Sequence, residues 1–223
     1  MPKWLKFIIG LLLLPACIGA ASALSRVVSA AGNAHTFWIA HTFWIALIGG
    51  AACWLTVFLL LPKPMLVYVF GHELTHALWT WACGGRVKKF KASAKGGHVV
   101  ITKSNFLIAL APYFFPLYAV LVIMVFVLGN LIWRWESYAP WFHFLLGASY
   151  AFHVTLTWHI LQTQQSDITE QGYLFSATVI WIGNVLVLLI GIPLLTSRVG
   201  VLDALAWWLN GTARVLHWLA RVF

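Results

Sequence analysis

The residues with the clearest chemical potential are two histidines and a glutamate in the segment Gly71-His72-Glu73-Leu74-Thr75-His76. In a helix, residues four apart lie on one face about one turn apart, so the imidazoles of His72 and His76 can bind a single metal ion. The carboxylate of Glu73, next to the first histidine, can then reach water bound to that metal. This HExxH spacing predicts a metal site, with zinc as the ion and Glu73 as the catalytic base.

The motif lies inside a hydrophobic stretch, and this position strengthens the prediction. An ionisable side chain at the centre of a membrane helix costs about 2.5–3.5 kcal/mol on insertion scales, so a lipid-facing role would leave that cost unmet. A polar cluster that binds neighbouring helices or water is the alternative interpretation. We expect the metal site.

A catalytic zinc site has three protein ligands and one open position, so a third ligand is expected elsewhere in the chain. If the basic segment after the motif is cytoplasmic, the later helices bring the loop before the last span back to the same side, and this loop contains Asp167. Asp167 is therefore the expected third ligand, although it is also well suited, with Ser166, to cap a helix. His153 and His159 are the rival ligands.

The composition excludes a soluble domain. Hydrophobic residues make up 62% of the 223 residues and charged residues only 9%, whereas soluble domains carry about 25% charged residues. The aromatic content of 16% excludes a disordered chain, and three cysteines in apolar sequence exclude a disulfide scaffold. We predict an all-α polytopic membrane protein with about six transmembrane helices, near Phe7–Val28, Phe37–Leu61, Met65–Cys83, Phe106–Ile132, Trp141–Leu161 and Tyr173–Leu195.

Two segments depart from the pattern of spanning helices. After the motif helix, the Gly96-Gly97 pair between two β-favouring runs predicts a short β-like hairpin near the membrane surface. Residues 201–223 carry polar side chains at helical spacing opposite leucine and tryptophan, which predicts an amphipathic helix in the interface; a seventh span is the alternative. The chain thus divides into two N-terminal transmembrane helices (1–63), a membrane core with the motif (64–196) and an amphipathic interfacial tail (197–223).

Basic residues are concentrated in one interhelical segment. Six of the 14 lysines and arginines fall within residues 86–103, which contain no acidic residue. The positive-inside rule places such a segment on the cytoplasmic side, with membrane lipid rather than nucleic acid as its partner. We therefore expect an integral, multi-pass protein of a bacterial cytoplasmic membrane. The first apolar stretch begins like a signal peptide, but its apolar residues continue past Cys17, which favours an uncleaved helix.

Residues 64–190 resemble the site-2 protease family of intramembrane zinc metallopeptidases. The resemblance rests on HELTHAL in a hydrophobic helix, the following Gly84-Gly85-Arg86-Val87, a β-like segment and a later aspartate. It implies that His72, His76 and Asp167 bind one zinc ion and that Glu73 is the base, within a metallopeptidase-like core. Where that family has an Asn-Pro and a Leu-Asp-Gly signature around the aspartate, this chain has Ser166-Asp167-Ile168 and Gly172.

The functional hypothesis is a membrane-embedded zinc metalloprotease that hydrolyses peptide bonds of membrane proteins within or near the bilayer. The run from Gly96 to Ile101 could pair, as an edge strand, with an unwound substrate segment, or it could be a hairpin on the lipid surface. Two other hypotheses remain: an ion or proton transporter that uses intramembrane His and Asp residues, and a catalytically silent protease-like scaffold. The side chains considered as oxyanion donors are those of His98, Asn105 and Asn184.

Overall fold

The computed structural model describes residues 1–32 and 37–222, and the side chains of all of these except residues 37–41. The described chain is mostly helical and forms two compact units. One unit consists of Met1–Ala40 and Ser166–Phe223, and the other of His41–Gln165. The predicted division of the chain after residues 63 and 196 is based on sequence pattern rather than on packing contacts. It stays a prediction.

Four of the described helical segments are long and apolar enough to cross a membrane. They are Lys3–Gly32, Thr42–Leu60, Trp135–Leu161 and Tyr173–Thr196, and a bent pair of helices adds a fifth if it counts as one span. The predicted helical membrane architecture is supported, whereas the count of six is not reproduced. The motif helix α3 (Met65–Ala82) is not among these segments, because two histidines and a glutamate lower its hydropathy.

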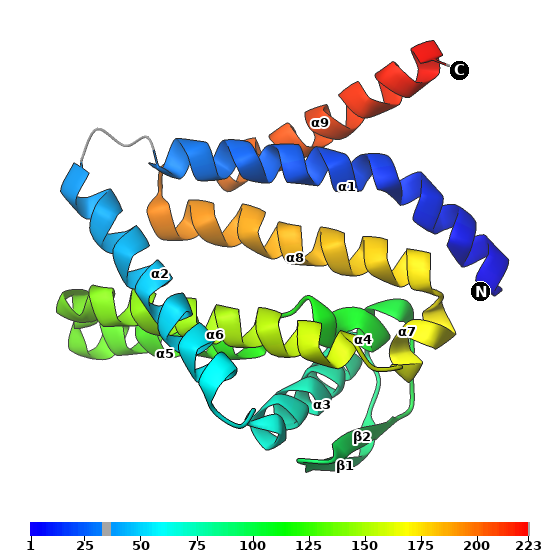
Figure 1. Ribbon diagram of the computed structural model, residues 1–223, viewed down its shortest axis with the longest axis horizontal. Coiled ribbons are helices and arrows are strands. Elements are labelled where there is room, and N and C mark those ends of the chain that lie inside the picture. Colours follow the sequence, from blue (N-terminus) through cyan, green and yellow to red (C-terminus); the bar gives the residue numbers. More distant parts are fainter. Residues whose placement is uncertain (33–36, 223) are drawn as a thin grey trace. The chain divides into compact units, whose positions relative to one another are not determined.

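The unit that contains both ends of the described chain is built from α1 (Lys3–Gly32), α7 (Ser166–Gln171), α8 (Tyr173–Thr196) and α9 (Val201–Val222). Helix α1 runs beside both α8 and α9, as Figure 1 shows. Its crossing with α9 is close because glycines face each other: a Cβ added to Gly211 would lie 3.1 Å from the Cα of Gly19. The indole of Trp208 also donates a hydrogen bond of 2.9 Å to the Ala16 carbonyl. The amphipathic helix predicted for the tail is confirmed, and its interfacial position stays a prediction.

The second unit contains most of α2 (Phe37–Leu60) and all of α3, a hairpin, α4 (Phe106–Leu110), α5 (Leu117–Trp133) and α6 (Ala139–Leu161). Buried Tyr68 and Val69 of α3 pack against Phe152 and Leu156 of α6. The Trp54 indole of α2 donates to the Thr155 hydroxyl of α6 at 2.9 Å. Helix α6 therefore packs against the motif helix α3 and is also hydrogen-bonded to α2.

The segment predicted as one span from Phe106 to Ile132 is broken. Helix α4 continues into a 3-10 turn, Ala111–Tyr113, and α5 then leaves at an angle of 78°. Pro112 and Pro116 flank the bend. Proline has no backbone N–H to donate and clashes with the preceding turn, so two prolines four residues apart end one helix and start another.

The predicted hairpin is confirmed. Strands β1 (Val87–Ser93) and β2 (Gly96–Ile101) pair antiparallel, with Phe90 opposite Val99. Gly96 follows the turn with φ of +135°, a conformation that side chains disfavour. The hairpin packs against α3, where the ring of Phe90 meets that of Phe70 edge-on at 5.6 Å.

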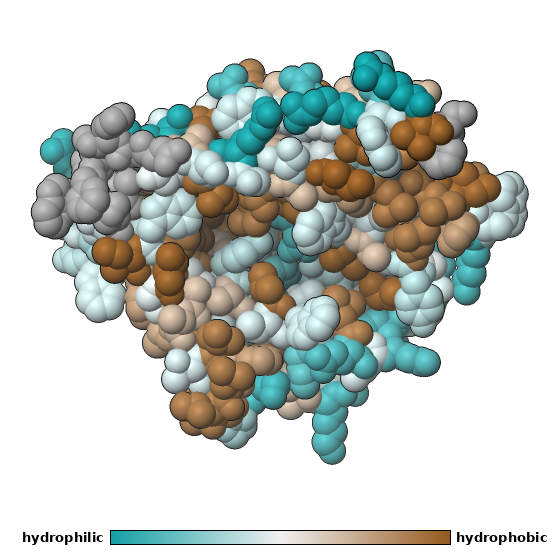
Figure 2. All heavy atoms as spheres, turned by 45° about the horizontal axis from the view of Figure 1, so that its top comes forward, coloured by the Kyte–Doolittle hydropathy of each residue, from teal (hydrophilic) through white to brown (hydrophobic). Residues whose placement is uncertain are grey.

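Large apolar side chains remain exposed along the long helices. Leu60 is 77% exposed, Leu131 76% and Leu12 72%. Figure 2 shows brown hydrophobic side chains on the surface of one face, with teal hydrophilic ones beside them. Contiguous apolar surface of this kind is unfavourable in water and favourable against lipid tails, in agreement with the apolar composition.

Candidate metal centre

The two histidines of the motif face one another on α3. Their Nε2 atoms lie 3.2 Å apart, and the two rings meet edge-on. Two nitrogens that each lie 2.0–2.1 Å from a tetrahedral zinc ion are about 3.3 Å apart. The spacing of these two donors therefore fits one zinc ion without a change of helix geometry, as the sequence predicts for His72 and His76.

The ring of His76 is held by a main-chain atom of α4. Its Nδ1 lies 2.8 Å from the Ile108 carbonyl oxygen, and a carbonyl can only accept. Nδ1 therefore carries the proton, which leaves the lone pair of Nε2 for a metal. Helix α4 is itself fixed at its start, because the Asn105 side chain accepts a hydrogen bond of 2.9 Å from the Ile108 N–H.

The carboxylate of Glu73 is buried against the hairpin. Glu73 is 7% exposed, and a Cβ added to Gly97 of β2 would lie 2.7 Å from Glu73 Cγ and 2.9 Å from Oε1. Only a residue without a side chain allows the strand to come this near. The hairpin thus covers Glu73 on one side and limits how far its carboxylate can move.

A methyl group at Gly97 should disturb Glu73 while leaving the histidines in place. In Gly97→Ala the new Cβ would also meet the Lys91 carbonyl at 2.6 Å, so the strand or the carboxylate must shift. Under the hypothesis of a zinc metalloprotease, we expect at least a tenfold loss of peptide hydrolysis with unchanged zinc content, measured on purified protein in liposomes. Gly191→Ala is the matched control, since nothing lies within 4 Å of its added Cβ. Equal activity of the two variants would contradict the role of the hairpin.

The remaining predicted site residues lie on other elements than the motif helix. Asp167 lies in the first turn of α7, half-buried, and belongs to the other unit. His153 is buried on α6, whereas His159, further along that helix, meets the Phe58 ring edge-on at 6.4 Å. His153 also lines a small cavity together with His72.

The three oxyanion candidates lie on three different elements: His98 on β2, Asn105 at the start of α4 and Asn184 on α8. Successive residues of a strand point to opposite faces, so His98 points away from the face on which Gly97 meets Glu73. The side chain of Asn105 is used as the cap of α4. That of Asn184, in the other unit, donates to the Ile180 carbonyl at 2.9 Å.

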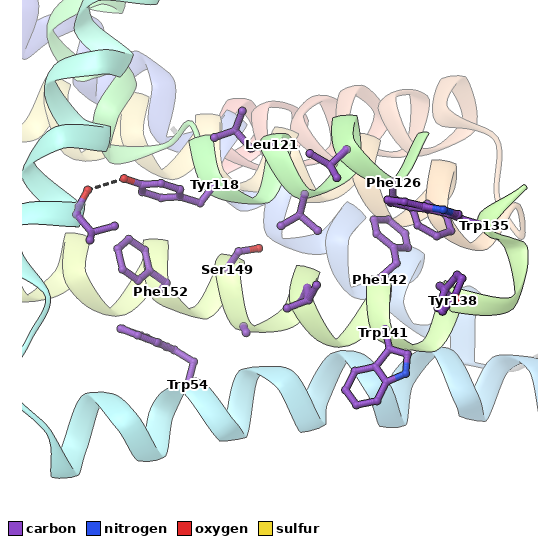
Figure 3. A pocket seen from close by; sticks show the side chains of 15 residues that line it. Trp54, Tyr118, Leu121, Phe126, Trp135, Tyr138, Trp141, Phe142, Ser149 and Phe152 are labelled. Carbon is purple, nitrogen blue, oxygen red and sulfur yellow. Dashed lines mark hydrogen bonds between the residues drawn. The ribbon is translucent and has the colours of Figure 1, made fainter. Parts of the chain in front are cut away.

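A large apolar groove lies beside the motif helix within the second unit. Its volume is about 770 Å³, and its lining combines aromatic and aliphatic side chains of α2, α5, α6 and the turn between α5 and α6 (Figure 3). The Tyr118 hydroxyl at its end donates to the Val67 carbonyl of α3, and the Tyr118 ring covers Gly71, next to His72. Tyr118 and Phe152 also line the small cavity beside His72, so these two rings separate the groove from that cavity.

No protein-family model matches this chain, and neither does a curated protein or a solved structure. The resemblance to site-2 proteases therefore rests on features of this sequence alone.

Proposed function

We propose that the protein is a membrane-embedded zinc metalloprotease that hydrolyses peptide bonds of membrane proteins within or near the bilayer. The observation that carries the proposal is the pair of imidazole Nε2 atoms 3.2 Å apart, beside a buried glutamate. Neutral imidazoles with a main-chain hydrogen bond on the far nitrogen are the usual zinc ligands, and HExxH adds the general base.

The roles of the residues follow from this arrangement. A zinc ion held by His72 and His76 would acidify a water molecule and polarise the carbonyl of a substrate. Glu73 removes the proton from the attacking water and passes it to the leaving amine. The buried position of Glu73 under Gly97 restricts its motion, so the carboxylate needs little reorganisation during the two proton transfers.

Asp167 is the proposed third ligand, and the length of the chain allows it. His153 of α6 lines a cavity with His72, and α6 ends at Leu161, about 12 Å further along the helix. From Leu161 to Asp167 the chain has six residue steps, which reach about 20 Å when extended. The connection is therefore long enough to return a carboxylate to the two imidazoles, which would complete the donor set of three that catalytic zinc requires.

Metal analysis of Asp167→Ala tests this assignment. We expect wild-type protein to retain one zinc ion per chain after dialysis and the variant to lose most of it, because two imidazoles alone bind zinc weakly. Asp203→Ala, an acid on α9, is the control and should keep its zinc. Full zinc content in the Asp167→Ala variant would exclude Asp167 as a ligand and leave His153 and His159 as the candidates for the third ligand.

The substrate class follows from the groove. Its lining is mostly apolar, and three of its polar side chains already donate hydrogen bonds: the Trp54 indole to Thr155, the Tyr118 hydroxyl to Val67, and the Ser149 hydroxyl to Leu146. A surface with few available hydrogen-bonding groups accepts apolar side chains rather than a polar peptide. We infer that an apolar segment of a membrane protein lies in the groove next to the metal centre, with the edge of β2 available to an unwound stretch.

The orientation proposed for the protein places residues 86–103 at the cytoplasmic surface. The basic side chains at positions 86, 88, 89, 91, 95 and 103 are all exposed. Exposed lysines and arginines near a bilayer attract anionic lipid headgroups, each with about 1 kcal/mol. This attraction would hold the hairpin, and with it Gly97 and Glu73, at the membrane surface.

A further inference from the structure

A small cavity lies behind the ring of His72, within the second unit. It has a volume of about 20 Å³, and its polar lining residues are Tyr68, His72, Thr75, His153 and Tyr118, whose hydroxyl already donates to the Val67 carbonyl. This volume accommodates a single water molecule, which needs two or more polar partners to be bound there.

His153 brings a hydrogen-bonding nitrogen to this cavity. The residue is 6% exposed, and its Nε2 is buried without a hydrogen-bond partner among the residues that the structure describes. Buried polar atoms in native proteins are paired with protein groups or with ordered water. The cavity beside His153 has room for one water molecule, and this water is the hydrogen-bond partner that we assign to its Nε2.

The side of His72 on which the cavity lies decides whether His153 has a positioning role or a catalytic one. Around a helix, each residue advances about 100°, so Glu73 and His76 lie on one side of His72, and Gly71, Tyr68 and Thr75 on the other. The cavity lies on the second side, away from Glu73. Since Nε2 of His72 faces His76, the nitrogen left for the cavity side is Nδ1, which is buried.

We propose that one water molecule in this cavity joins Nδ1 of His72 to Nε2 of His153, which makes His153 a positioning residue of the metal centre. The water accepts the Nδ1–H of His72 and donates to the lone pair of His153. Protonated at Nδ1, His72 presents the lone pair of Nε2 to the metal, as the Ile108 carbonyl arranges for His76. The inference rests on the proposed zinc site, because its consequence is the affinity of that site for zinc.

The test compares His153→Phe with His153→Gln by zinc competition against a chelator. Phenylalanine removes the acceptor, and we expect 10- to 100-fold weaker zinc binding, the usual effect of losing a group that orients a ligand. Glutamine keeps a polar atom near the position of Nε2 and should restore affinity to within about threefold. His143→Phe and His143→Gln, on the same helix, are the controls and should bind zinc like the wild type. Unchanged affinity in His153→Phe, or equal loss in both His153 variants, would overturn the proposal.

A second measurement separates this inference from the proposed function. In zinc-free protein Nε2 of His72 donates to Nε2 of His76, since Nδ1 of His76 already donates to the Ile108 carbonyl, and the water then donates to Nδ1 of His72 as well as to His153. Nitrogen NMR of ¹⁵N-labelled histidine should therefore show His72 change from the Nε2–H to the Nδ1–H tautomer when zinc binds, while His153 stays protonated at Nδ1. If no zinc binds but His153 is protonated at Nδ1, the protease proposal fails and the water bridge stands. If zinc binds but His153 is protonated at Nε2, the bridge fails and the metal site stands.

Discussion

Glu73→Gln should abolish peptide hydrolysis while leaving zinc bound. Glutamine has nearly the shape of glutamate, so it fits the buried space under Gly97, but it cannot take a proton from water. General base catalysis contributes about 10²–10⁴-fold, and we expect a loss of activity in that range. The measurement uses purified protein in liposomes with quenched single-span transmembrane peptides, alongside elemental analysis of zinc.

The control for this prediction is Glu136→Gln, an exposed acid in the same unit. It removes the same charge from the same unit without touching the motif, and it should cleave at the wild-type rate. Normal cleavage by the Glu73→Gln protein would end the protease proposal. Loss of zinc in that variant would show instead that the carboxylate is needed to hold the metal.

His72→Ala and His76→Ala should each remove the metal. A single ion held by two imidazoles 3.2 Å apart loses half of its nitrogen donors in either variant. We expect zinc binding to weaken by more than the about 10- to 100-fold typical of a group that only orients a ligand, with cleavage falling to background. His217→Ala, exposed on α9, is the control and should keep both zinc and activity.

The same variants test the transporter hypothesis. A transporter that uses these histidines would carry metal ions or protons into liposomes, and His72→Ala would stop the flux. The protease predicts cleavage without flux. Flux in the wild type, together with uncleaved peptides, would replace the proposal with the transporter.

Much of the fold follows from the sequence, because length and apolarity are local properties. Four of the predicted long apolar helices, the hairpin after the motif and the amphipathic last helix are present as predicted. The break after α4 was not predicted, although Pro112 and Pro116 lie four residues apart in the sequence and mark it. The motif helix is the opposite case: its two histidines and its glutamate lower its hydropathy, so a predicted span is not among the four long apolar helices.

Only part of the candidate site can be predicted from the sequence. The pairing of His72 with His76 follows from helical spacing. The partner of His76 does not, because it is a carbonyl of Ile108, and every residue has a carbonyl. The approach of Gly97 to Glu73 and the cavity shared by His72 and His153 depend on how distant segments pack, which no local pattern specifies.

Because a main-chain oxygen accepts the hydrogen bond from His76, evolution can change the side chain at that position more easily than the length of the chain before it. Exchanging the side chain of Ile108 leaves the acceptor in place, so residue identity at that position is weakly constrained. Adding or deleting one residue between the hairpin and α4 would rotate the oxygen away from the imidazole. Relatives of this chain should therefore vary freely in the amino acid at this point and keep the number of residues between Ile101 and Ile108 constant.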